Sequence, residues 1–219
     1  MESNTKIPMA ELQQKIEKLK TGTTTIGICI KDGVILATES QATAGYLVAS
    51  KTAQKLFKIN EKVGATIAGG VADCQYVVGQ AQAISRLREI ETGNAPSLEH
   101  IAMIVRNILF SGRSYYYSFM LVGGYSEKEK RGKVYAIDFI GFMAEETKFT
   151  SFGSGMYYAF GVLEANYKDD MTEKEGIELA RKALKAARER DAGSGYGMQI
   201  VVITKDGFKA IEGPLTKTQ

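Results

Sequence analysis

The spacing of apolar residues divides the chain into a short helical arm and a longer region of strands and helices. Within the first 22 residues, four apolar side chains recur every three or four positions: Met9, Leu12, Ile16 and Leu19. Such spacing among Gln, Glu and Lys residues predicts an amphipathic helix. The pattern changes at Thr23, where a run of β-branched residues predicts a strand. We therefore expect an N-terminal arm over residues 1–22 and one folded domain over residues 23–219.

From Thr23 onward, runs typical of strands alternate with runs typical of helices. The expected strands cover residues 23–30, 34–38, 56–59, 65–68, 119–122, 134–137, about 142–152 and 198–204, followed by a short return strand. The expected helices cover residues 73–91, 98–110, 156–167 and 172–190, and residues 127–133 are expected to form a solvated hairpin loop. Ser97 is a candidate N-cap, and Thr172 with Glu175 forms a candidate capping box. Strands joined by tight turns are antiparallel, so the order predicts an α+β fold: a four-layer αββα sandwich of two antiparallel sheets flanked by helix pairs.

The composition is that of a folded protein without a nucleic-acid or membrane partner. Of the 219 residues, 44% are hydrophobic and 24% are charged, which excludes disorder over most of the chain. The 28 Lys and Arg residues are interspersed with 25 Asp and Glu residues, so no basic stripe for nucleic acid is expected. The N-terminus lacks the apolar run of a secretory signal, and no stretch reaches the ~18 apolar residues of a membrane span. Together with only two cysteines, this predicts a cytoplasmic protein.

Missing residue types narrow the possible chemistry. His100 is the only histidine and lies in an expected helix, where a lone histidine is more often structural than part of a Ser/His/Asp or Cys/His site. With Cys29 and Cys74 it makes too small a set for a Cys/His zinc site. The glycine-rich run at residues 193–197 lacks the third glycine of a dinucleotide loop, and no G-x-x-x-x-G-K motif occurs. We expect neither a metal nor a nucleotide cofactor.

The junction between Gly22 and Thr23 offers a nucleophile that needs no histidine. If the bond between them is cut, Thr23 gains a free α-amino group, whose pKa in model peptides is about 7.7–8.0. That amine can take the proton from the hydroxyl of the same residue. Gly22 suits the cut because, without a Cβ atom, its backbone tolerates strained angles and its carbonyl is open to attack. While the arm is attached, the amide nitrogen of Thr23 cannot act as a base.

Three further positions at strand ends could supply the electrostatic surroundings of such a nucleophile. Lys55 could lower the pKa of the amine and stabilise the alkoxide, Glu39 could orient Lys55, and the backbone N–H of Gly69 could bind an oxyanion. On their own these positions are ambiguous. A Lys/Glu pair at strand ends is usually a surface ion pair, and paired glycines usually form a turn.

Six short motifs resemble, in the same order, those of the β subunit of the proteasome core particle, most closely in its archaeal form. They are GTTTIGI at 22–28, ATE at 37–39, KLF at 55–57, TIAG at 66–69, GSG at 153–155 and RDAGSG at 190–195. The resemblance extends from residue 22 to about residue 213, which is nearly the whole chain. It implies the sandwich fold of the N-terminal nucleophile hydrolases, in agreement with the pattern above, and a threonine-type endopeptidase.

The resemblance also assigns roles to residues. It implies that Thr23 is the nucleophile, released by autocatalytic cleavage after Gly22, and that residues 1–22 are a propeptide. Glu39, where many members carry Asp, and Lys55 are then the orienting pair, and Gly69 is the oxyanion donor. Three residues resemble the polar network that holds the threonine amine and the catalytic water: Ser154, Asp191 and Ser194. Loop hydrogen bonds for the two serines, and a helix-end turn for the aspartate, are the alternative interpretations.

Side-chain selectivity, substrates and partners are likewise implied by the resemblance. Five positions are similar to the primary specificity pocket and carry no charge, which predicts cleavage after hydrophobic residues: Ala42, Ala53, Ile67, Val71 and Gln75. The family stacks two seven-membered β rings between two rings of α subunits (α7β7β7α7), and an ATPase regulator delivers unfolded polypeptides to the chamber. Two alternatives stay open: a silent β subunit that keeps its arm and acts only as a ring scaffold, and the related ATP-dependent bacterial protease that also begins Thr-Thr.

Overall fold

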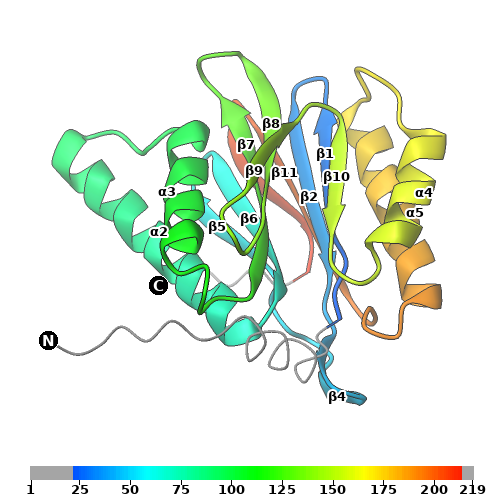
Figure 1. Cartoon of the computed structure of the whole chain (residues 1–219). Coiled ribbons are helices and arrows are strands. Elements are labelled where there is room, and N and C mark those ends of the chain that lie inside the picture. The colour runs from blue at the N-terminus through cyan, green and yellow to red at the C-terminus, as the bar shows by residue number, and fades with distance from the viewer. Residues whose placement is uncertain (1–21, 214–219) are drawn as a thin grey trace, which may run out of the picture.

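Two five-stranded antiparallel sheets lie face to face in the computed structural model, which describes residues 22–213 (Figure 1). The first sheet has the order β10-β1-β2-β11-β12. Its strands are β1 (Thr25–Ile30), β2 (Gly33–Glu39), β10 (Phe149–Phe152), β11 (Met198–Thr204) and β12 (Gly207–Glu212). The second sheet runs in the order β5-β6-β7-β8-β9. Its strands are β5 (Leu56–Asn60), β6 (Val63–Gly69), β7 (Ser118–Ser126), β8 (Arg131–Ile137) and β9 (Met143–Glu146).

Two helix pairs cover the outer faces of these sheets. The pair on the second sheet is α2 (Val71–Thr92) and α3 (Leu98–Ser111), and the pair on the first is α4 (Met156–Asn166) and α5 (Glu173–Arg190). The expected four-layer αββα sandwich is confirmed. The N-cap predicted for α3 is also present, because Ser97 accepts a hydrogen bond from the N–H of His100, and Thr172 and Glu175 form the capping box of α5.

The side chains of each strand point alternately to its two faces, and the apolar ones form three layers. One face of each sheet packs on its helices, with Ile26 and Ile28 of β1 on one side of the molecule and Ile67 of β6 on the other. The opposite faces pack on each other, and this middle layer includes Leu36, Leu56, Leu121, Val201 and Ile203. Because successive strand residues point to opposite faces, each strand contributes to two layers.

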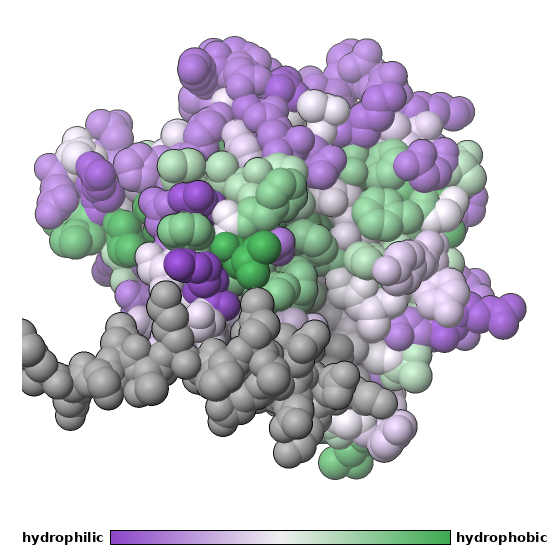
Figure 2. Space-filling view, in the orientation of Figure 1, coloured by the Kyte–Doolittle hydropathy of each residue, from purple (hydrophilic) through white to green (hydrophobic). Residues whose placement is uncertain are grey.

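The site described below lies at one end of the sandwich. The turns between β1 and β2 and between β7 and β8 lie at the upper end in Figure 1, where Figure 2 shows a concentration of hydrophilic residues. The first residues of β1 and the last residues of β2 lie at the lower end. Open-ended sandwiches expose strand ends and loops rather than sheet faces, so this end can carry functional side chains.

Three local expectations differ from the structure. The run over residues 142–152 is two strands, β9 and β10, because the chain crosses there from one sheet to the other. A two-stranded hairpin, β3 (Ala42–Ala44) with β4 (Leu47–Ser50), was not expected. Residues 127–133 are only partly a loop, because β8 begins at Arg131. Lys133 is buried there, with Nζ 2.5 Å from Glu129 and 2.8 Å from Glu145.

The amphipathic stripe of Met9, Leu12, Ile16 and Leu19 lies outside the described residues. Within residues 22–213, no helix is long and apolar enough to cross a membrane.

Candidate active site

The junction between Gly22 and Thr23 lies inside the molecule. Thr23 precedes β1 and is only 5% exposed. Its hydroxyl donates a hydrogen bond to the carbonyl oxygen of Gly22, with Oγ1 and O 2.5 Å apart. Gly22 packs so tightly on Gly193 that a Cβ on either residue would lie 2.0–2.3 Å from the Cα of the other. Glycine is therefore required at both positions by the space between the two backbones.

Lys55 and Glu39 form a buried ion pair beside the Thr23 hydroxyl. Lys55 precedes β5 and Glu39 ends β2, so the two opposed sheets bring them together. The Lys55 ammonium contacts a carboxylate oxygen of Glu39 and donates to Thr23 Oγ1 at 2.9 Å. It also lies 3.5 Å from the carbonyl oxygen of Gly22. The pair is not the surface ion pair that its position at strand ends also allowed.

Three backbone N–H groups fix the Glu39 carboxylate. Oε2 accepts from Gln41 at 2.6 Å and from Gly195 at 3.1 Å, and Oε1 accepts from Thr24 at 3.3 Å. Burial raises the pKa of Glu39, while the attraction of Lys55 opposes that rise. Burial likewise lowers the pKa of Lys55, opposed by the negative charge of Glu39. A lysine with a lowered pKa beside a hydroxyl is suited to proton transfer.

Asp191 links both predicted serines to the residues that precede β1, Thr23 and Thr24. As the C-cap residue of α5, it accepts hydrogen bonds from Ser154 Oγ and Ser194 Oγ, each at 2.6 Å from Oδ2. Ser154 Oγ in turn accepts from the backbone N–H of Thr23 at 3.1 Å. Ser194 Oγ lies 2.7 Å from Oγ1 of Thr24. One carboxylate thus connects the loops after β10 and α5 to the first residues of the domain.

Gly69 and Thr23 line the same small cavity. Gly69 ends β6 with φ of +116°, and a Cβ there would lie 2.4 Å from the carbonyl oxygen of Tyr117, so no other residue fits. The cavity has a volume of about 20 Å³, room for about one water molecule. Cys74 also lines it, but burial raises the pKa of this thiol to about 12, which keeps the thiol protonated and unreactive near neutral pH.

Three of the five residues expected around a specificity pocket line this cavity. They are Ala53, Ile67 and Val71, which come from the entry to β5, from β6 and from the start of α2. Ala42 lies in β3 and Gln75 on an exposed turn of α2, and neither lines it.

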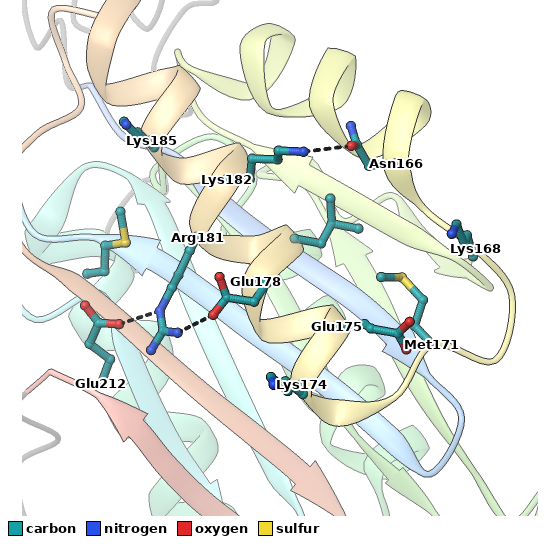
Figure 3. Close-up of a pocket in the computed structure, with 12 residues that line it drawn as sticks. Asn166, Lys168, Met171, Lys174, Glu175, Glu178, Arg181, Lys182, Lys185 and Glu212 are labelled. Atoms are coloured by element: carbon teal, nitrogen blue, oxygen red, sulfur yellow. Dashed lines mark hydrogen bonds and ion pairs between the residues drawn. The ribbon is translucent and has the colours of Figure 1, made fainter.

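A larger groove of about 850 Å³ lies elsewhere, along α5 (Figure 3). Arg181 pairs there with Glu178 and Glu212, and Lys182 donates to Asn166. None of the predicted site residues lines this groove, and it contains no Ser, Thr, Cys or His. The volume of this groove is therefore no guide to the candidate active site, which lies at the much smaller cavity beside Thr23.

Two glutamines that contact the site were not identified from the sequence. Gln41 donates its backbone N–H to Glu39 and its side-chain amide to the carbonyl of Ala192 at 2.8 Å. Gln199 accepts a hydrogen bond from the backbone N–H of Lys55 at 3.0 Å. No spacing rule signals them, because their partners are distant in sequence or are backbone atoms. The only signal is an apolar strand, MQIVVIT, whose second residue is a polar glutamine.

Known proteins of one family are similar to this chain over most of its length. Residues 19–203 match the family model described as proteasome subunit. The chain is 47% identical over 193 residues to a proteasome subunit beta of Methanocaldococcus jannaschii, covering 87% of this chain and 85% of the relative. It is 46% identical over 199 residues to that of Methanocorpusculum labreanum, covering 90% and 93%. The corresponding protein of Archaeoglobus profundus is 42% identical over 202 residues, covering 91% of each.

Proposed function

Because this chain belongs to the proteasome subunit family, as a β subunit of the archaeal type, we propose that it is a threonine-type endopeptidase that cleaves its own chain between Gly22 and Thr23. A peptidase role follows from the family. The threonine mechanism is supported by one observation above all: a buried Lys55 ammonium 2.9 Å from the Thr23 hydroxyl, which itself points at the carbonyl of the bond to be cut.

In the intact chain, we infer the following self-cleavage. Burial lowers the pKa of Lys55, and in its neutral form the Lys55 amine accepts the proton from Thr23 Oγ1 and becomes an ammonium. The oxygen bonds to the carbonyl carbon of Gly22, the carbon–nitrogen bond breaks, and the nitrogen of Thr23 takes the proton back from Lys55 and becomes a free amine. Water then hydrolyses the ester, which leaves a carboxylate on Gly22 and regenerates the hydroxyl.

After cleavage, the free amine of Thr23 replaces Lys55 as the base. Ser154 Oγ, 3.1 Å from this nitrogen, holds it in place, and Asp191 holds Ser154. The positive charge of Lys55 favours the neutral amine and stabilises the alkoxide. The hydroxyl attacks a peptide carbonyl, the amine passes the proton to the leaving nitrogen, and water releases the acyl group from the ester. The N–H of Gly69, beside the same cavity, is our candidate donor to the oxyanion.

The proposed substrates are unfolded polypeptides, cleaved after hydrophobic residues. This preference is supported by three apolar residues that line the cavity beside Lys55: Ala53, Ile67 and Val71. We further propose that the chain works within a core of two seven-membered β rings between rings of α subunits, fed by an ATPase regulator. Residues 1–22 are proposed to be the propeptide.

N-terminal sequencing of the assembled particle tests the proposal, with Thr23→Ala as the matched variant. The wild-type chain is expected to begin at Thr23 and to hydrolyse peptides, whereas Thr23→Ala should keep residues 1–22 and lack activity. A wild-type chain that keeps those residues after assembly and is inactive would instead be a silent scaffold subunit. A trimmed Thr23→Ala particle with wild-type activity and no second β subunit would contradict the proposal.

A further inference from the structure

Gln199 is a buried amide at one end of the middle apolar layer, in a row across the first sheet with two other buried polar residues, Thr38 and Thr25. It lies on β11, two and four residues before Val201 and Ile203, and so on the face that packs against the second sheet. Its side chain is almost fully buried, at 1% exposure for the residue. A polar group in such a place is tolerated only when its hydrogen bonds are satisfied.

All the polar contacts of its side chain fall on one short segment of backbone. The carbonyl oxygen Oε1 accepts from the N–H of Lys55 at 3.0 Å and from the N–H of Leu56 at 3.1 Å. The amide Nε2 donates to the carbonyl oxygen of Ala53 at 2.8 Å. Neighbouring N–H groups point to opposite sides of an extended strand, so two of them on one oxygen mean that the chain bends at the entry to β5.

This bend directs Lys55 to the nucleophile. Leu56 joins the middle apolar layer, while the adjacent Lys55 side chain reaches Thr23 Oγ1 at 2.9 Å. Ala53, held by the other end of the same amide, lines the cavity that Thr23 also lines. A single side chain from the opposite sheet therefore fixes both the lysine and one wall of the cavity.

The position of Gln199 in its own sheet strengthens this link. It pairs in register with Thr38, the residue before Glu39, and Thr38 in turn pairs with Thr25 of β1. Thr38 donates its hydroxyl to the carbonyl of Thr24 at 3.0 Å. The row across β1, β2 and β11 thus joins Thr38, the residue before Glu39, to Gln199 on the next strand, which holds the backbone of Lys55.

We propose that Gln199 is a positioning residue for the reaction at Thr23, setting the backbone from which Lys55 reaches the hydroxyl. The assignment rests on the proposed function. A glutamine is required because one side chain must offer an acceptor with two lone pairs and a donor, at a length that asparagine lacks by one methylene. Gln199 touches neither the nucleophile nor the cavity, so it acts only through Lys55 and Ala53.

Two variants and one control test this role in the assembled particle. Gln199→Met keeps the shape but removes all three hydrogen bonds, and Gln199→Asn keeps the amide but shortens its reach. The control is Gln82→Met. Gln82 donates to the carbonyl of Lys58 at 2.8 Å, so it holds the same strand without contacting the segment at Lys55.

The readouts are thermal unfolding and the dependence of kcat, KM and kcat/KM on pH. If Lys55 moves away, the amine of Thr23 loses a neighbouring positive charge and its pKa rises. Both Gln199 variants should therefore lower kcat by about tenfold or more and shift the acid limb of kcat/KM to higher pH, with a raised KM from the displaced Ala53 wall. The control should leave the acid limb in place.

Three results would overturn the role. The first is a Gln199 variant that assembles and keeps the wild-type kcat and acid limb. The second is an equal kcat loss in the Gln82 control with all acid limbs unmoved. The third is failure of both Gln199 variants to assemble while the control assembles, which would make the glutamine purely structural. Failure of the proposed function is distinguishable, because it would show in the wild-type chain and in Thr23→Ala.

Discussion

Replacing Glu39 by Gln removes a charge from the site while keeping the size of the side chain. Glu39 is fully buried, and one carboxylate oxygen is paired with Lys55. The other oxygen accepts the N–H groups of Gln41 and Gly195. A glutamine could keep these two backbone bonds through its carbonyl oxygen, but its NH2 group would then face the Lys55 ammonium. Both groups are donors, so the contact with Lys55 is lost.

The expected effect of Glu39→Gln is large on both stability and rate. Removing one partner of a buried pair lowers the free energy of unfolding by about 3–5 kcal/mol, because the other group is left buried without its counter-charge. Burial already lowers the pKa of Lys55, and Glu39 opposes that shift. Without Glu39 the pKa of Lys55 falls further, so its amine is neutral over more of the neutral pH range. Losing a charged donor at a reacting oxygen should lower kcat by about 10²–10³-fold.

Peptide hydrolysis and thermal unfolding of the assembled particle measure these effects, with Glu39→Asp as the matched control. Asp keeps the charge and shortens the side chain by one methylene, so we expect a loss of no more than about tenfold, or 1.4 kcal/mol. The reasoning is refuted if Glu39→Gln keeps kcat within about threefold of wild type, since that corresponds to less than 1 kcal/mol. It is also refuted if Asp costs as much as Gln, because charge would then not be the deciding property.

Three further outcomes are expected. Gly22→Ala places a methyl group against Gly193 and should slow self-cleavage by about 10–100-fold, the equivalent of 1–3 kcal/mol of overpacking. The control is a chain expressed from Thr23 onward, which should have normal activity. Unchanged processing of Gly22→Ala would contradict the tight packing of Gly22 on Gly193. Burial raises the pKa of Cys74 from 9.0 to about 12, so above pH 9 the unfolded chain loses this proton first and the free energy of unfolding falls by about 1.4 kcal/mol per pH unit. Cys74→Ala should make this decline less steep between pH 9 and 11 in urea unfolding, and an unchanged slope would show that Cys74 does not contribute to it. Ser97→Ala removes the N-cap of α3 and should cost about 1 kcal/mol in the same assay, whereas Ser97→Asp should not.

The layer order could be predicted from the sequence because it depends on local pattern. Period-two runs and period-3.6 runs alternate clearly, and caps such as Ser97 mark helix ends. The division of residues 142–152 into β9 and β10 could not be predicted, because both strands have the same local character and differ only in the sheet they join. The β3–β4 hairpin was missed for a related reason: it packs into neither large sheet, so no buried face imposes alternation on it.

Some residues of the site can likewise be found from local sequence motifs, whereas others can be found only from the fold. Motifs locate Thr23, Glu39 and Lys55, and the structure brings the three into contact. The groups that hold them are less accessible to sequence reasoning. Gln41 and Gln199 act by hydrogen bonds to backbone atoms, which every residue possesses. The partner can therefore be any type of residue, and the sequence does not reveal which one it is. Only the fold shows that residue 199 lies against residue 55.

The contact between Gly22 and Gly193 separates two roles that the site otherwise combines. Lys55 and Thr23 take part both in the proposed self-cleavage and in the hydrolysis of other chains, so a variant that acts on them should slow both reactions together. Gly22 leaves after cleavage, so its contact with Gly193 can influence only the first reaction. The ratio of the two rates therefore distinguishes them: it should stay near the wild-type value in Gln199→Asn and change by about 10–100-fold in Gly22→Ala, the range that overpacking predicts. A changed ratio in Gln199→Asn would mean that Lys55 is held differently before and after the cut.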